Sequence, residues 1–484
     1  MQQKKSYNFG WRGWLLVIWV ATGMLSYVVA GNYPLNIMAD FYGGAQTLSM
    51  IYTGASIVGI IVQIIVSRKA GAIKSWKGVS VVLGIASIVF MILEMIIKPG
   101  VPWLIFYGLA TALTALYGTW ALSVLVGVWF PRRKGTVMGI VTFAFPIGNA
   151  LIGPFASSFF GNFGARMGML GPKIGEMIGE LIGKGVNPDL APQQAEMIVA
   201  GQAAQGAAFA ALWPFVLVVL VGFIIGIIFI SEFPEQVGAF RDNDRSFTPE
   251  MAQAMMKAEE ENRKTTVWTT GHTFACPDFW LIVIPEGLLL FFAVGAMTQT
   301  NAMITPYEGV PGIISAVGGY NNVMLFIAAA GIIGSYVFGL IDTKKGTKFA
   351  VALSCIFMIV SGIFGFIDNG TTLFIGFMIL GLFMGASSNY TVSSAVQYWR
   401  IEDFPSVFSA VNPVANLINA FGPMVVAALI AAGGTKSVFI GILVAGVVGT
   451  ILALLFKPAR VKAYDDKYRS AAGKPLDDVL VGRK

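Results

Sequence analysis

Apolar residues occur along this chain in twelve long runs separated by short polar segments. Each run has about the 20 residues that an α-helix needs to cross roughly 30 Å of hydrocarbon. Prolines inside the runs, such as Pro146, Pro285 and Pro413, are tolerated in a membrane bundle because neighbouring helices satisfy the freed backbone groups. The pattern predicts an all-α membrane protein with twelve transmembrane helices, at approximately 12–31, 46–66, 77–97, 102–129, 136–160, 209–231, 279–305, 320–341, 348–367, 371–398, 405–432 and 437–457.

The positions of lysine and arginine predict how these spans are oriented. Cytoplasmic loops of membrane proteins carry an excess of both residues. If both termini are cytoplasmic, the segments on the outer side contain few of the 32 basic residues, namely Lys98, Arg166, Lys173, Lys184 and Lys436. We therefore expect a multi-pass protein of the cell membrane with both termini in the cytoplasm.

Three internal matches indicate that the chain is a duplication. Asn301 lies 269 residues after Asn32, Gly422-Pro423 lies 269 residues after Gly153-Pro154, and Trp399 lies 270 residues after Trp129. Because each copy would hold six spans, the two copies are parallel repeats about an axis along the membrane normal. This predicts an N-terminal six-helix half at 1–231, a cytoplasmic linker at 232–278, a C-terminal six-helix half at 279–457 and a cytoplasmic tail at 458–484.

One predicted outer loop, 161–208, is long enough to hold structure of its own. Within it apolar residues recur at helical spacing with charged residues between them, at Ile174, Met177, Ile178, Leu181 and Ile182. This pattern is typical of an amphipathic helix. We expect that helix to lie on the outer face of the protein, as a lid or as a simple spacer.

Composition supports a lipid environment and excludes several classes of protein. Hydrophobic residues make up 56% of the chain and charged residues 12%, about half the charge of an ordinary globular domain. The two cysteines, Cys276 and Cys355, give no metal or disulfide pattern. The formal charge of +7 comes from basic residues that lie mainly in the predicted cytoplasmic segments, so we expect no nucleic acid partner. We also expect no enzyme activity, cofactor or metal, since the chain has no nucleophile–base set, metal cluster or phosphate loop.

Two loops carry a family resemblance. Gly339-Leu-Ile-Asp342-Thr-Lys-Lys-Gly346 after the eighth span, and Ser67-Arg68-Lys69-Ala70-Gly71 after the second, resemble the inter-helix loop motif of the major facilitator superfamily. Trp129-Phe-Pro-Arg132-Arg133-Lys134-Gly135, followed by a Gly/Pro-rich fifth span, resembles the oxalate/formate-antiporter branch and bacterial bile-acid carriers. The resemblance implies a transporter, of bacterial origin, that works by alternating access as a monomer.

The same resemblance bears on the substrate. Oxalate carriers of that branch hold dicarboxylates with basic residues in spans eight and eleven, yet 320–341 and 405–432 contain no lysine or arginine. A larger, amphiphilic or monoanionic organic solute therefore fits better than oxalate.

Glu286 is the predicted proton-coupling residue. It lies in the seventh apolar run between Pro285 and Gly287, and no basic residue is available within the spans to pair with it. A charge in mid-membrane costs on the order of 2.5–3.5 kcal/mol, so a carboxyl group there needs a function or a neutral, hydrogen-bonded packing role. We keep both possibilities. Glu94 and Asp40, near predicted outer ends, are expected to reach water.

Other candidates are polar and aromatic residues placed midway along the inner helices, where transporters of this kind bind substrate. Asparagine and tyrosine can donate hydrogen bonds to a carboxylate without carrying charge, although each can equally hold helices together. The substrate-binding candidates are Asn32, Tyr33, Asn36, Tyr117, Trp120, Asn149, Gln299, Asn301, Asn389, Tyr390, Asn412 and Asn416. Candidates for a cytoplasmic gate of ion pairs, or for plain topology signals, are Asp342, Lys344, Lys345, Arg400, Glu402 and Asp403.

These observations favour a secondary active transporter of a small organic solute. The first choice is proton-coupled uptake of an organic monocarboxylate or bile-acid-like amphiphile. An organic-anion exchanger of the oxalate/formate type is the alternative. A membrane sensor that binds its solute without carrying it is an alternative from another class.

Overall fold

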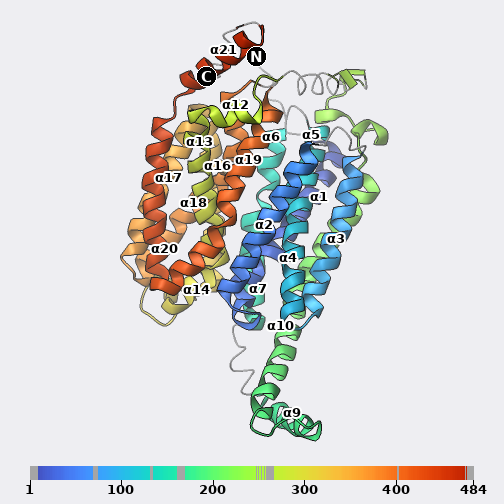
Figure 1. Ribbon diagram of the computed structural model, residues 1–484, viewed down its shortest axis with the longest axis vertical. Helices are drawn as coiled ribbons and strands as arrows, with labels where there is room; N and C mark the ends of the chain where they lie inside the picture. Colours follow the sequence, from blue (N-terminus) through green and yellow to red (C-terminus); the bar gives the residue numbers. More distant parts are fainter. Residues whose placement is uncertain are drawn as a thin grey trace.

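The computed structural model describes residues 9–68, 75–130, 134–160, 169–246, 266–400 and 403–474, together with residues 248, 250, 251, 253, 254, 257 and 476. Over these residues the regular structure is helical (Figure 1). Eleven of the described helices are long and apolar enough to cross a membrane. The prediction of an all-α membrane protein is confirmed.

The first half of the chain contains six passes, two of which hold π-helical turns. The first pass is α1 (Gly10–Tyr27) continued by π-turns at Val28–Asn32 and Pro34–Met38. The fourth joins α4 (Val101–Thr114), a π-turn at Ala115–Ala121 and α5 (Leu122–Trp129). The others are α2 (Ala45–Arg68), α3 (Trp76–Ile96), α6 (Lys134–Val141) with α7 (Ala144–Phe160), and α10 (Ala191–Phe229).

The second half also makes six passes. Its last long apolar segment, Ser406–Leu455, has 50 residues and contains two of them. The helices are α13 (Pro277–Thr298), α16 (Tyr320–Lys345), α17 (Thr347–Phe366), α18 (Gly370–Tyr398), α19 (Phe404–Ala420) and α20 (Gly422–Leu455). Short helices between or after them are α12 (Thr270–Ala275), α14 (Thr300–Ile304), α15 (Ile313–Ala316) and α21 (Pro458–Ala471).

Two glycines inside α20 separate the eleventh pass from the twelfth. Gly433 is extended, with φ −166°, and Gly434 has φ +68°, a left-handed conformation that glycine adopts without steric cost. The chain reverses there, since the Cβ position of Gly441 lies 3.2 Å from the side chain of Leu429. Thr435 holds the turn by donating a hydrogen bond to the carbonyl of Met303. The eleven long apolar helices therefore make twelve passes, as the sequence predicts.

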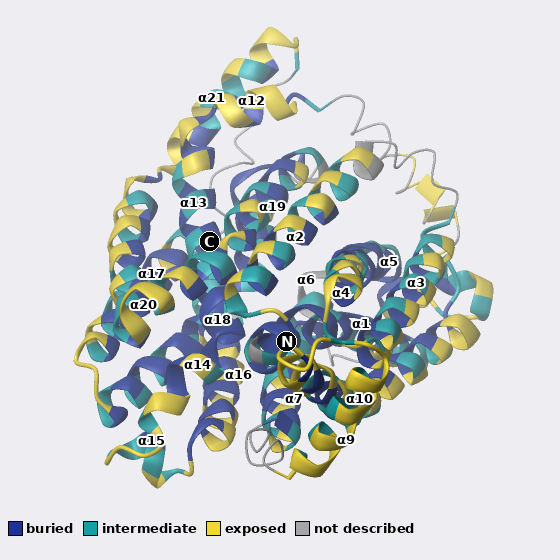
Figure 2. Cartoon of the chain, turned by 60° about the horizontal axis from the view of Figure 1, so that its bottom comes forward, coloured by how far each residue is buried: buried dark blue, intermediate teal, exposed yellow. Residues whose placement is uncertain are grey.

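The passes form two groups that lie side by side in Figure 1, blue to green on the right and yellow to red on the left. Within the second group α17 packs on α18 and α20, and α16 packs on α18. The groups meet where α2 contacts α19 and α20, and where α7 contacts α16. Seen from the end that carries α9, the buried residues gather on the inner faces of the helices, as Figure 2 shows.

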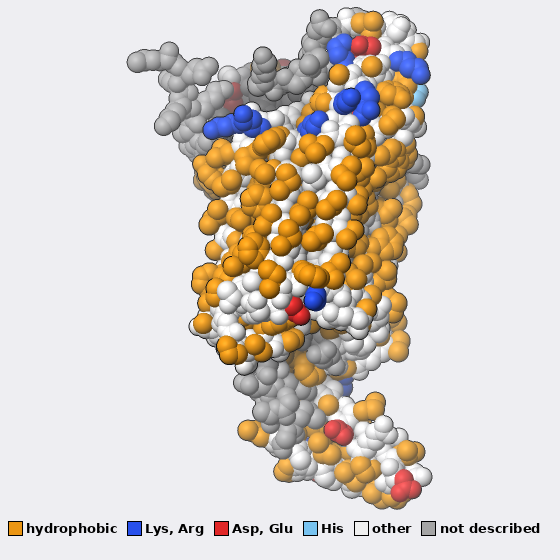
Figure 3. Space-filling model, turned by 90° about the vertical axis from the view of Figure 1, so that its left-hand side faces the viewer, with side chains coloured by type: hydrophobic (Ala, Val, Ile, Leu, Met, Phe, Trp, Pro, Cys, Tyr) orange, Lys and Arg blue, Asp and Glu red, His pale blue; other side chains and the backbone are white. Residues whose placement is uncertain are grey.

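Apolar side chains cover the outside of the bundle. Figure 3 shows them as a band across the face that it draws, with lysine and arginine gathered beyond one edge of the band. Exposed apolar residues on the helices of both halves include Val82, Ile105, Val218, Ile333 and Val444. Their exposure would be unfavourable in water but is expected where lipid is the solvent.

The two ends of the bundle are named here by their contents. The termini end holds the start of α1, the end of α5 and the whole of α21; the hairpin end holds α9 (Gly171–Gly183) and the start of α10 (Figure 1).

The helical hairpin differs from the expectation of a helix lying flat on the outer face. α10 contains 39 residues and is therefore about 58 Å long, nearly twice the thickness of a bilayer core. Its first part stands clear of the bundle with α9 packed against it (Figure 1). Ala191, Ala195 and Val199, spaced four residues apart, are buried there. The predicted sixth span, 209–231, is only the second part of this helix, and residues 161–168 lie outside the described residues.

Candidate functional site

Glu286 lies at the centre of the second half. It is the tenth residue of α13 and has no exposed surface. Neither carboxyl oxygen has a hydrogen-bond partner among the described residues. Ser394 on α18 lies close to the carboxyl group without reaching hydrogen-bond geometry. Burying a polar group without a hydrogen-bond partner costs free energy. A carboxyl group at this position therefore destabilises the fold, which favours a functional reason for its presence.

The neighbours of Glu286 in sequence shape its surroundings. Pro285 has no N–H group, so the carbonyl of Leu281 loses its helical partner. A Cβ atom on Gly287 would lie 2.7 Å from the side chain of Ile418, so α13 and α19 cross closely at this point. The carboxyl group is therefore held where α13 meets two helices of its own half, α18 and α19.

Polar side chains of α16 and α18 lie between this region and the termini end. Asp342, near the end of α16, accepts hydrogen bonds from Thr347 at 2.6 Å and from Ser393 on α18. Ser394 follows Ser393 directly and faces Glu286. Asp342 is half-buried, while Lys344 and Lys345 are exposed. The predicted gate residue Asp342 thus bonds to Ser393, the neighbour in sequence of the serine that lies close to Glu286.

Hydrogen bonds between the two halves gather at the hairpin end. The side chain of Asn36 donates to the hydroxyl of Tyr320 at 2.8 Å and accepts from the backbone N–H of Asn301 at 2.9 Å. Gln299 lies 3.3 Å from the hydroxyl of Ser49. Two further bonds join Thr53 to the carbonyl of Ala420 and Ser157 to Asn321. The structure therefore has the two halves bound together at the hairpin end.

The structure brings only some of the predicted substrate-binding residues together. Asn36 contacts Asn301 across the halves, and Asn412 contacts Asn416 within α19. Tyr33 is buried with an unpartnered hydroxyl, and Asn32 accepts a long bond from Tyr52. The remaining candidates stay within their own halves: Tyr117 bonds to Trp19, Tyr390 to Ser354, Asn149 to its own helix at Phe145, Trp120 packs on Trp76, and Asn389 is half-buried in α18.

Two other predicted gate residues, Arg400 and Asp403, form a buried cluster of charges at the termini end. Asp465 on α21 accepts from Arg400 and from Arg469, both at 3.0 Å, and from the indole of Trp268 at 2.8 Å. Arg469 also donates to Asp403. The cluster joins the end of the linker, the start of α19 and the C-terminal helix. Glu402 and the loop residues 69–74 and 131–133 lie outside the described residues.

Sequence reasoning missed several of these residues. Tyr320 and Asn321 begin the eighth span, where their polarity could have indicated a contact at a helix end. Asp465 and Arg469 are spaced four residues apart on a short helix, a spacing that favours ion pairs. The expectation that Glu94 reaches water is wrong: it is 1% exposed, because Trp103 and Tyr107 pack over the end of α3. The side chain of Asp40 is not described.

Comparisons with known proteins agree with this architecture. The sequence model described as Major Facilitator Superfamily matches residues 323–479, within the second half and the tail. The chain is similar to the human organic anion transporter MFSD10 (TETRAN), with a TM-score of 0.54 and 11% identity over 91% of this chain and 99% of that one. No curated protein matches the chain by sequence.

A second solved structure is a bacterial homolog of the human lysosomal transporter Spinster in an inward-facing and unoccupied conformation. The TM-score is 0.53 and the identity 13%, over 96% of this chain and 98% of that one. The protein therefore has the major facilitator fold and is a multi-pass α-helical membrane protein. The oxalate/formate and bile-acid resemblance within that fold stays a prediction.

Proposed function

We propose that this chain is a secondary active transporter that takes up an organic monocarboxylate or a bile-acid-like amphiphile together with a proton. The observation that carries the proposal is Glu286, a buried carboxyl group whose two oxygens have no hydrogen-bond partner among the described residues. Such a group is stable in the membrane only when neutral. It can gain and lose a proton when one end of the bundle opens to water, which is the property that coupling requires.

Alternating access supplies that opening. The hydrogen bonds between the halves at the hairpin end support a conformation in which this end is closed. The proton would then reach the buried Glu286 from the termini end, on the side of Ser394 and Asp342. Opening the hairpin end breaks the bonds of Asn36. The proposal assigns the hairpin end to the outside and both termini to the cytoplasm, in the plasma membrane, with the chain acting as a monomer.

The chemistry of the helices supports a monoanionic substrate rather than a dicarboxylate. α19 contains no lysine or arginine, and those of α16 are Lys344 and Lys345 at its last turn. Neutral donors such as Asn389, Asn412 and Asn416 can hold one carboxylate by hydrogen bonds. The structural neighbour MFSD10 is described as an organic anion transporter, which is the same broad class of solute.

Proteoliposomes test the proposal. An inward proton gradient should drive uptake of a labelled monocarboxylate or bile acid by the wild type. Glu286→Gln should abolish the gradient's effect while counterflow, in which unlabelled solute inside drives labelled solute inward, continues. Glu94→Gln is the matched control, since Glu94 is also buried but lies in the other half. Unchanged gradient-driven uptake in Glu286→Gln would remove the coupling role.

The same vesicles separate the alternatives. An exchanger would show uptake only when a counter-anion is loaded inside, whatever the proton gradient. A sensor would bind solute, raising the protein's melting temperature, but would show no counterflow.

A further inference from the structure

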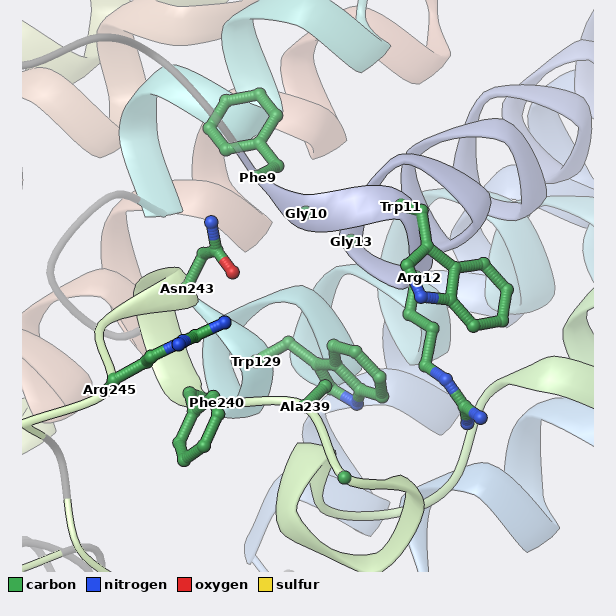
Figure 4. Close-up of a pocket in the computed structure, with 11 residues that line it drawn as sticks. Phe9, Gly10, Trp11, Arg12, Gly13, Trp129, Ala239, Phe240, Asn243 and Arg245 are labelled. Atoms are coloured by element: carbon green, nitrogen blue, oxygen red, sulfur yellow. The ribbon is translucent and has the colours of Figure 1, made fainter.

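A pocket of about 200 Å³ lies at the termini end of the first half, away from Glu286 (Figure 4). It lies between the first turn of α1 and the linker segment 238–245, with Trp129 at the end of α5 between them. The indole of Trp129 is buried and fixed by a hydrogen bond to the carbonyl of Ser231. The pocket is therefore built on a rigid base formed by the ends of the fourth and sixth passes.

Among the residues that the structure describes, two arginines and no carboxylate line this pocket. Arg245 is exposed and has neither a hydrogen bond nor an ion pair among the described residues; Figure 4 shows its side chain extending from the linker into the space beside Trp129. Arg12 is on the other side, with its guanidinium 4.7 Å above the ring of Trp11 and a long contact of 3.4 Å to the carbonyl of Phe229. Both positive charges are available to an anion.

The acids of the linker segment 235–244 are already engaged. Glu235 forms an ion pair with Arg241 at 3.2 Å, and Asp244 accepts two hydrogen bonds from Ser246. Asp242 is buried and has contacts of its own. In addition, the N-cap residue of α1, Phe9, makes no capping hydrogen bond with its side chain, and the first turn of the helix holds no acidic residue. The helix dipole therefore places a partial positive charge on the same side of the pocket as Arg12.

The rim of the pocket is apolar and exposed. Trp11 is 60% exposed and Phe240 37%. Tryptophan concentrates where hydrocarbon meets the headgroups of a bilayer, and arginine forms paired hydrogen bonds with phosphate oxygens. A ligand that satisfies both features carries a phosphate at one end and acyl chains at the other.

We propose that this pocket binds the phosphate group of an anionic phospholipid in the leaflet at the termini end, with Arg12 and Arg245 as its ligands and Trp11 and Phe240 against its chains. The bound lipid would tie the linker to the first helix. Because the pocket joins the first helix, the end of α5 and the start of the linker, a bound lipid would stabilise this end of the first half whether or not substrate is bound.

Native mass spectrometry of the purified full-length chain tests this proposal. Phosphatidylglycerol should stay bound to the wild type after delipidation, and phosphatidylcholine should not. The double variant Arg12→Gln/Arg245→Gln should retain about tenfold less phosphatidylglycerol. Lys257→Gln is the matched control, since it removes one charge from an exposed position of the same linker, and it should bind as the wild type does.

Three results would overturn the proposal. Equal lipid retention by the double variant would exclude the arginines as ligands, provided that its melting temperature without lipid matches the wild type. An equal loss in Lys257→Gln would mean a diffuse attraction to surface charge. Displacement of the lipid by inorganic phosphate at similar concentration would identify a soluble phosphate as the occupant. None of these results depends on transport, so the proposed function is tested separately.

Discussion

Arg469 donates a hydrogen bond of 2.8 Å to the carboxylate of Asp403, and both side chains are almost completely buried. The two residues are 66 positions apart and belong to the C-terminal helix α21 and to the start of α19. Asp465 and Arg400 complete this cluster of two acids and two arginines. Because α19 also contacts α2 of the other half, the tail of the protein is anchored to a helix at the boundary between the halves.

Asp465→Asn should destabilise the protein strongly. The change leaves Arg400 and Arg469 buried without their shared carboxylate, and breaking a buried ion pair costs about 3–5 kcal/mol. Asp466→Asn, one residue along, removes only a partly exposed pair with Lys462 and should cost about 0.5 kcal/mol or less. Denaturant unfolding in detergent measures both. Equal effects of the two changes would show that the cluster contributes nothing beyond surface charge.

Asn36→Leu should weaken closure of the hairpin end. It removes the bonds to Tyr320 and Asn301, each worth about 1 kcal/mol, which together lower the closing equilibrium constant by about thirtyfold. A cysteine pair at Ser157 and Asn321, which contact each other across the halves, reports closure by its rate of disulfide formation. Asn149→Leu is the control because its amide bonds only to its own helix; the same slowing in both variants would contradict a specific gate.

Gly334→Val should disrupt the packing of α16 against α18. A Cβ atom at Gly334 would lie 1.8 Å from the carbonyl oxygen of Leu382, a backbone atom that cannot move aside alone. Overpacking of this kind costs about 1–3 kcal/mol and should lower the melting temperature. Gly339→Val on the same helix meets no atom within 4 Å and should leave the melting temperature close to that of the wild type.

Single cysteines should be labelled from opposite sides of the membrane. Lys257→Cys and Ala472→Cys should react only with reagents on the cytoplasmic side, and Glu196→Cys in the hairpin only from outside. The native Cys276 and Cys355 are buried, and burial raises the pKa of the Cys276 thiol, so at neutral pH little reactive thiolate forms and background labelling stays low. Labelling of residues 257 and 472 from opposite sides would contradict the paired six-span architecture.

The sequence by itself determined the spans and the duplication. Hydrophobic length is a local property, so the observed helices other than α10 begin and end close to the predicted runs, as α3 at Trp76–Ile96 shows against 77–97. Gly433 and Gly434 lie in the predicted gap between spans eleven and twelve. The prediction that Glu286 has a function also rests on local sequence, because a carboxyl group lies there within an apolar run beside a proline. The overhang of α10 was missed because its alanine- and glutamine-rich first part is too polar to be recognised as a continuation of a span.

Only the tertiary structure decided which polar residues meet. The sequence makes Asn36 and Asn301 candidates for a substrate site, yet they bond to each other at the hairpin end. Asp403 and Arg400 bind a tail helix whose sequence indicates only a charged cytoplasmic segment. Helical periodicity tells which face a side chain occupies but not which helix that face meets. That choice depends on the packing of residues hundreds of positions apart, such as the glycine contacts that set how closely two helices approach.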